Sequence, residues 1–129
     1  MKHSGPRNIG LGSIKGYRFP ITAISSILHR ITGVLMVVLL PFLLWAFSAS
    51  LACKNGFSQV HNLLIHSPLS ILTWIFISAV SYHVIAGLRH LIMDFGFAEE
   101  MNTAKVTSVL VLILGVIVTI FWGLWIWVI

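Results

Sequence analysis

Long apolar runs separated by short polar stretches dominate the pattern of the chain. Asp, Glu, Lys and Arg are absent from 31–53, 55–88 and 106–129. A transmembrane helix needs about 20 consecutive apolar residues to cross the hydrocarbon core of a bilayer. The pattern therefore predicts three membrane-spanning helices, at about 20–52, 68–93 and 106–129.

Proline and the polar stretches indicate where these helices begin, bend and end. Pro20 suits the first turn of a helix, and Pro41 predicts a kink inside the first span. We expect a polar turn at 54–59, an amphipathic interfacial segment at 61–68, and a loop at 94–105. The fold class is thus an all-α integral membrane protein.

Composition supports the same class. Only 9% of the 129 residues are charged and 58% are hydrophobic, whereas soluble domains carry about 25% charged residues. This excludes a soluble domain, and it excludes a disordered chain, which needs low hydrophobicity and high charge. The expected organisation is an N-terminal arm at 1–19 and one three-helix transmembrane domain at 20–129.

The basic residues predict the orientation. The net charge is +5, but no basic run or stripe suggests nucleic acid as a partner. Most lysines and arginines outside the spans lie in the arm or the 94–105 loop. They are Lys2, Arg7, Lys15, Arg18 and Lys105, against Lys54 on the other side. The positive-inside rule then places the N-terminus in the cytoplasm and the C-terminus in the periplasm of a bacterial inner membrane.

Three tryptophans near the end of the third span have two interpretations. Trp122, Trp125 and Trp127 are expected to form an aromatic belt at the outer interface. The alternative is that they pack against other helices.

Polar residues on one face of the second span suggest a cofactor site. His83, Gly87, His90 and Asp94 are spaced by four, three and four residues, so they share one helical face. Helical rise puts His83 near mid-membrane and Gly87 one turn away, where a flat macrocycle could approach. An imidazole so placed could ligate haem iron, or it could hydrogen-bond a neighbouring helix.

The first span carries polar groups near the same membrane face. Arg30 could bind a haem propionate in bidentate fashion, and His29 and His90 could donate as well. Ser26 and Arg30 lie one turn apart and could donate to the carbonyl oxygens of a quinone. Alternatively, the Ser26 hydroxyl bonds back to a carbonyl of its own helix.

A second axial ligand is missing from the depth of His83. His29 and His90 are expected nearer the cytoplasm, and His61 and His66 on the far side. The haem would be five-coordinate, or a second membrane chain would supply the other ligand. We infer a partner subunit and a heteromeric helical bundle, with the third span as scaffold because it has no ionisable side chain.

Two segments carry a family resemblance. The segment 83–96, HVIAGLRHLIMDFG, resembles the signature of the cytochrome b subunit of succinate dehydrogenase, in which H-x-x-x-G is followed by an aliphatic residue, R-H and D-x-G. The segment 18–33, RFPITAISSILHRITG, is similar to the family's first-helix motif, S-I-x-H-R-x-[ST]-G. Together with three spans, the two motifs cover nearly the whole chain.

The resemblance implies a membrane anchor in respiratory complex II. Such an anchor would hold a flavoprotein and an iron–sulfur subunit at the membrane without itself oxidising succinate, and electrons would pass to ubiquinone. His83 would be one axial ligand of a haem b shared with a second anchor. His29, Arg30 and His90 would lie near the propionates, and Ser26 and Arg30 would line the quinone site. Asp94 would close its helix or pair with a cation, without a catalytic role.

Two other functions are considered. One is the anchor of a quinol:fumarate reductase that works in the reverse direction, because direction depends on cofactors in other subunits. The other is a purely structural anchor whose motifs serve packing alone.

Overall fold

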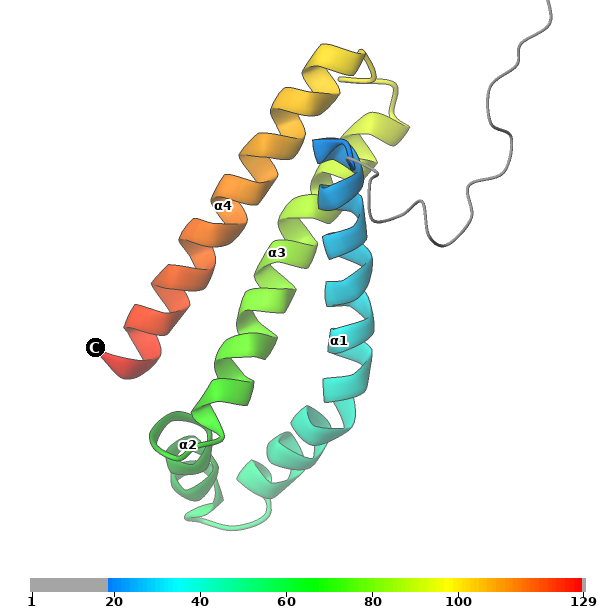
Figure 1. Ribbon diagram of the computed structural model, residues 1–129. Coiled ribbons are helices and arrows are strands. Elements are labelled where there is room, and N and C mark those ends of the chain that lie inside the picture. The colour runs from blue at the N-terminus through cyan, green and yellow to red at the C-terminus, as the bar shows by residue number, and fades with distance from the viewer. Residues whose placement is uncertain (1–18, 129) are drawn as a thin grey trace, which may run out of the picture.

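The computed structural model describes residues 19–128, which form four helices (Figure 1). They are α1 (Ile21–Leu51), α2 (Gly56–His66), α3 (Ser70–Asp94) and α4 (Met101–Trp127). The predicted N-terminal arm lies almost wholly outside the described residues, and so do the basic residues that it carries.

Three of the described helices are long and apolar enough to cross a membrane, namely α1, α3 and α4. This confirms the all-α class and the three predicted spans. Most of their large apolar side chains are exposed, as expected for surfaces that face lipid or another membrane chain. The helix α2 has 11 residues, which is too short to span a bilayer.

Two boundaries differ from the prediction. The helix α4 begins at Met101 rather than 106, so the predicted 94–105 loop is only a turn at 95–100, and α2 begins within the predicted polar turn. The absence of charge marks the part of a helix that lies in lipid, whereas the helix itself can continue beyond it. Residues 101–105 contain no Gly or Pro to stop helix formation.

The turn between α3 and α4 is a Schellman motif. Gly96 has a φ of 83°, and the N–H of Phe97 donates to the carbonyl of Ile92 over 3.2 Å. The N–H of Gly96 donates to Met93. These bonds end α3 directly after the exposed Asp94, and the short turn makes α3 and α4 antiparallel neighbours.

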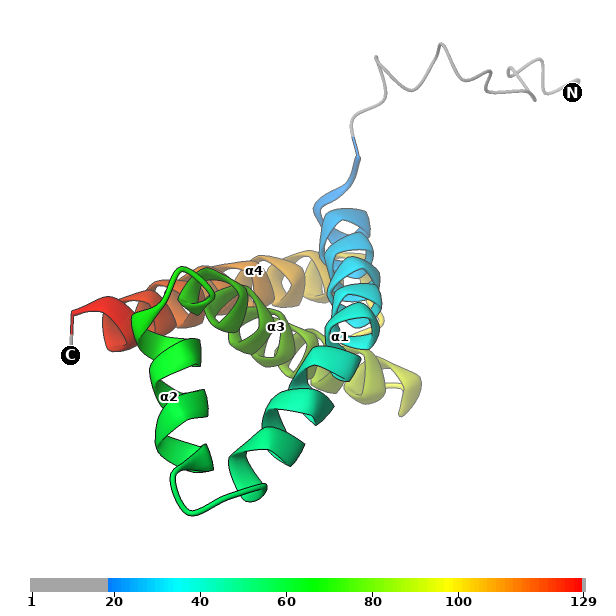
Figure 2. The ribbon, with the colours of Figure 1, turned by 90° about the horizontal axis from the view of Figure 1, so that it is seen from below.

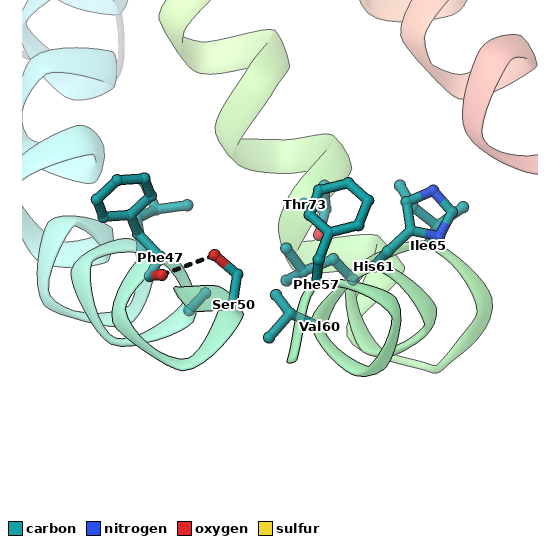
Figure 3. A pocket seen from close by; sticks show the side chains of 10 residues that line it. Phe47, Ser50, Phe57, Val60, His61, Ile65 and Thr73 are labelled. Atoms are coloured by element: carbon teal, nitrogen blue, oxygen red, sulfur yellow. Dashed lines mark hydrogen bonds between the residues drawn. The ribbon is translucent and has the colours of Figure 1, made fainter. Parts of the chain in front are cut away.

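The helix α1 changes direction in its second half, which contains Pro41 (Figure 1). Beyond the bend its last turns move away from α3, and α2 lies across the gap when the bundle is seen from below (Figure 2). A groove of about 340 Å³ separates these last turns from α2. Figure 3 shows Phe47 and Ser50 on one side of it and Phe57 and His61 on the other. His61 therefore lies at the opposite end of the molecule from the start of α1.

Small side chains bring the three spanning helices together. Ser25 of α1, Ala86 of α3 and Ser108 of α4 are fully buried. Small residues let helix backbones approach closely, which is the usual source of packing energy between helices in a bilayer. The ring of Tyr82 lies over Gly115 of α4, where an added Cβ atom would come within 2.5 Å of it.

Tryptophans link α3 to α4. Their indole N–H groups donate across the interface in three places: Trp74 to the carbonyl of Thr119 (2.9 Å), Trp122 to the hydroxyl of Ser81 (3.0 Å) and Trp127 to that of Ser70 (3.1 Å). For the half-buried Trp122 the structure supports the alternative interpretation, packing between helices. Trp127 also bonds to α3 but is 50% exposed, so it fits both interpretations. Trp125 remains half exposed, in keeping with a belt residue.

Candidate functional site: a histidine cluster between α1 and α3

Three of the predicted site residues meet between the first turns of α1 and the second half of α3. The rings of His29 and His83 are stacked, with centroids 4.0 Å apart and planes 21° apart. The ring of His90 lies 5.1 Å from His29 at 47°. We call these three residues the histidine cluster.

Hydrogen bonds set the state of the His83 ring. Its Nδ1 lies 3.0 Å from the carbonyl oxygen of His29 and 3.3 Å from Oγ1 of Thr32. A carbonyl oxygen can only accept, so Nδ1 carries the proton and donates it. In a neutral imidazole the other nitrogen, Nε2, then keeps its lone pair. This is how proteins orient a histidine that ligates a metal.

A glycine of α1 and a glycine of α3 each lie against an imidazole ring of the other helix. A Cβ atom on Gly33 would come 3.0 Å from Cε1 of His83, and one on Gly87 would come 3.4 Å from Nε2 of His29. The face shared by His83, Gly87 and His90 is thus confirmed, but the ring of His29 occupies the space over Gly87 that was expected for a macrocycle. Gly33 was not predicted as a site residue, although its place one turn after His29 is a signal that could have identified it.

His29 lies deeper than its position in the sequence suggested. It stacks on His83, so depth does not exclude it as a second axial ligand. The two rings lie face to face, with their planes 21° apart. His29 was therefore expected too near the cytoplasm, and the expectation that a second chain supplies the other ligand stays a prediction.

Arg30 and Ser26 lie apart from the stacked rings. Arg30 is exposed and stands at a shallow apolar groove of about 370 Å³ along α1. The groove is lined by Arg30, Ile31, Val34, Leu35 and Val38. Ser26 is half-buried and precedes Arg30 by one turn. The structure therefore presents two sides of α1, with His29 toward α3 and Arg30 toward the surroundings.

Arg89, which belongs to the sequence motif of α3, has a structural task. Its side chain is buried, with Nε donating to Oγ1 of Thr107 and Nη2 to the carbonyl of Ala104, both over 3.1 Å. Both acceptors belong to α4. The motif alone did not indicate this direction, because helical spacing places a residue on a face without saying which neighbour covers that face.

His90 connects the histidine cluster to the end of the bundle where α1 and α4 begin. It lines a cavity of about 340 Å³ together with Thr22, Arg89 and Glu99. The cavity therefore collects polar side chains from α1, from α3 and from the turn before α4.

The donor set argues against a metal ion held by side chains alone. Residues 19–128 contain no group of three or more His, Cys, Asp or Glu side chains that could bind one. A haem iron needs only axial ligands from the protein, and His83 offers a single oriented imidazole nitrogen.

Comparison with known proteins gives a consistent result. The family described as succinate dehydrogenase/fumarate reductase transmembrane subunit matches residues 11–122. A succinate dehydrogenase cytochrome b556 subunit of Coxiella burnetii is 34% identical over 112 residues, which cover 86% of this chain and 90% of that protein. The subunit of the same name from Paracoccus denitrificans is 36% identical over 97 residues, 71% of each chain. A cytochrome b560 subunit of succinate dehydrogenase from Reclinomonas americana is 30% identical over 109 residues, with 81% and 76% covered.

The match covers α1, α2 and α3 completely and α4 as far as residue 122, so it includes the histidine cluster and Arg30. The relatives' names favour succinate dehydrogenase over the fumarate reductase alternative. The chain belongs to the family of succinate dehydrogenase and fumarate reductase transmembrane subunits, as a membrane-anchoring subunit of the succinate dehydrogenase type.

Proposed function

We propose that this subunit ligates one side of a haem b through His83 and contributes to a ubiquinone site through Ser26 and Arg30. The observation that carries the haem part is the hydrogen bond from Nδ1 of His83 to the carbonyl of His29. It holds the ring and leaves on Nε2 the lone pair that would bind the iron. When bound, haem b can accept and release one electron at a time.

The residues around His83 support this role. The carbonyl of His29 and the hydroxyl of Thr32 hold the imidazole in place, and such partners raise the basicity of a ligating histidine. His29 and His90 of the cluster, and Arg30 on the neighbouring side of α1, carry N–H donors that would bind the propionates. Charge-assisted bonds from a guanidinium to a carboxylate are the strongest of them.

The second axial ligand would come from another anchor subunit. Within the described residues, the ring of His29 stacks on that of His83, and His61 and His66 belong to α2 at the other end of the bundle. A second small membrane chain with a histidine at mid-depth would complete the site. The flavoprotein and iron–sulfur subunits would dock on the same side as the histidine cluster.

Ser26 and Arg30 suit a quinone head group. Its two carbonyl oxygens accept hydrogen bonds, and a hydroxyl and a guanidinium one turn apart can donate to them. Arg30 stands at one end of the apolar groove of α1, along which an isoprenoid tail could extend in lipid. The chain would thus help to transfer electrons from the complex to ubiquinone.

The proposed orientation places the histidine cluster in the cytoplasmic half of a bacterial inner membrane. The starts of α1 and α4 lie at the same end of the bundle (Figure 1), and α4 carries Lys105 at this end. The turn before α2 carries Lys54 at the other end. When the basic residues that precede α1 in the sequence are counted with Lys105, the positive-inside rule assigns the side of Lys105 to the cytoplasm.

His83→Leu in the complete complex tests the haem assignment. We expect the b-type α-band in the reduced-minus-oxidised spectrum to be lost or altered, because no other described histidine of this chain can replace His83. His61→Leu, at the opposite end, serves as the matched control and should leave the spectrum unchanged. An unchanged α-band in His83→Leu would refute His83 as the ligand.

A further inference from the structure

Tyr82 lies where the three spanning helices meet. Its side chain is buried, and its ring rests on Gly115 of α4. Its hydroxyl donates to the main-chain carbonyl of Ser25 in α1 over 3.2 Å. One residue of α3 thus touches both other spans, through its ring on one side and its hydroxyl on the other.

The Ser25 side chain does not take part in this link. Ser25 is fully buried, and its Oγ has no hydrogen-bond partner among the described residues. The contact is made by the carbonyl, which in an α-helix also accepts the N–H of the residue four positions later, His29. The Tyr82 hydroxyl therefore binds the same carbonyl that holds the backbone of His29.

Two successive residues of α3 form hydrogen bonds with main-chain carbonyls of α1. Tyr82 donates to the carbonyl of Ser25, and His83 donates to the carbonyl of His29. The two acceptors are four residues apart, so they lie one turn apart along α1. Two such bonds fix how far α1 can slide along α3, because a shift that keeps one bond breaks the other.

These two hydrogen bonds lie beside the residues of the proposed haem and quinone sites. Ser26 follows Ser25, and His83 follows Tyr82, so the bond joins neighbours of a proposed quinone donor and of the proposed haem ligand. We propose that Tyr82 is a positioning residue that sets the register of α1 on α3, and so places Ser26 and Arg30 relative to His83. This inference rests on the proposed function. Tyr82 itself touches neither cofactor nor quinone in this role.

Tyr82→Phe in the complete complex is the direct test. The substitution removes the hydroxyl and keeps the ring on Gly115, so packing against α4 is preserved. We expect the KM for a short-chain ubiquinone to rise about two- to tenfold, the range that corresponds to one net hydrogen bond. The midpoint potential of the haem should shift, while succinate oxidation with a soluble acceptor should be unchanged.

Ser81→Ala provides a matched control on the neighbouring residue. The Ser81 hydroxyl accepts from the indole of Trp122 in α4, so this variant loses one hydroxyl contact on the other side of α3. It should leave both the quinone KM and the haem potential unchanged. If the role of Tyr82 were merely structural, Tyr82→Phe and Ser81→Ala would have the same quinone KM and the same haem potential.

Gly115→Ala supplies a second variant. Its Cβ atom would come within 2.5 Å of the Tyr82 ring, so the ring has to shift although its hydroxyl is kept. We expect the same rise in quinone KM. If Tyr82→Phe does not assemble, the KM of Gly115→Ala decides, and a normal value overturns the proposal.

The outcomes separate this inference from the proposed function. A normal quinone KM in Tyr82→Phe, or equal changes in Tyr82→Phe and Ser81→Ala, would overturn the positioning role alone, provided that His83→Leu alters the haem spectrum. If His83→Leu leaves that spectrum intact, the proposed function fails whatever Tyr82→Phe shows.

Discussion

The two spanning helices that pack against α3 use polar groups in different ways. Against α4, Arg89 and the indoles donate to carbonyl or hydroxyl oxygens. Against α1, the imidazole rings of the histidine cluster lie close together. Of the six ring nitrogens of this cluster, only Nδ1 of His83 forms a hydrogen bond within residues 19–128.

The difference shows that a polar residue inside a membrane span does not by itself indicate a site. Both interfaces contain cationic or titratable side chains at membrane depth, and such residues are usually functional. At the α4 interface Arg89 and the indoles donate hydrogen bonds to partners within the chain, which gives them a structural role. At the α1 interface ring nitrogens stay available, and this availability is what a cofactor site needs.

Arg30→Leu should give the largest effect, on the side of α1 that faces neither α3 nor α4. Losing a charged donor to the quinone corresponds to about 1.5–3 kcal/mol, so ubiquinone reduction should fall roughly 10- to 100-fold. Succinate oxidation with a soluble acceptor should stay intact. Equal loss of both activities would point to failed assembly instead of a quinone contact.

Arg89→Met tests whether the α4 interface is purely structural. Methionine approximates the length of the side chain and removes two hydrogen bonds to α4. At about 0.6 kcal/mol for each bond between membrane helices, stability should fall by roughly 1–2 kcal/mol. This would be seen as a lower temperature for loss of the assembled complex. The haem spectrum of complex that does assemble should equal that of the wild type. A lost α-band at unchanged stability would move Arg89 into the cofactor site.

Glycine-to-alanine substitutions compare the two interfaces with one methyl group each. Gly33→Ala would place a Cβ atom 3.0 Å from the His83 ring, whereas Gly123→Ala would place one 3.3 Å from the Trp74 indole on the α4 side. We expect the first to shift the haem α-band without abolishing it, and the second to leave it in place. Identical spectra for both variants would contradict the role of Gly33 in seating His83.

Trp122→Phe should have the smallest effect. It removes one indole hydrogen bond to Ser81, and hydrogen bonds between helices in membranes average about 0.6 kcal/mol. Thermal stability should decrease slightly, and quinone reduction and the haem spectrum should not change. A clear kinetic defect would mean that the α3–α4 interface also controls the site.

The sequence predicted the spans and one polar face, but not how the helices meet. Gaps in charge identify the apolar part of each helix, and spacing of three and four residues places His83, Gly87 and His90 together. Helical rise measures depth along one helix only. The relative height of His29 and His83 depends on how far α1 slides along α3, and contacts between residues 54 positions apart set this distance.

The same limit explains Arg89 and Trp122. The sequence predicted a role for each residue from the pattern of its own helix alone: Arg89 as part of the motif and Trp122 as part of the aromatic belt. The side chains to which they donate, Thr107 and Ser81, stand in apolar runs without a motif that marks them. Hydroxyl side chains within an apolar run indicate that a partner is possible, but not which one.

The Schellman turn at Gly96 has a consequence for how the subunit forms in the membrane. It places the first α3–α4 contacts only 15 and 18 positions apart in sequence, and short closures cost little chain entropy. The indole bonds then span 41, 45 and 57 positions, in order of distance from the turn. This order favours an α3–α4 hairpin whose contacts form first at the turn and then progressively farther from it. The histidines would be brought together afterwards, when α1, which precedes the hairpin in the sequence, docks onto it.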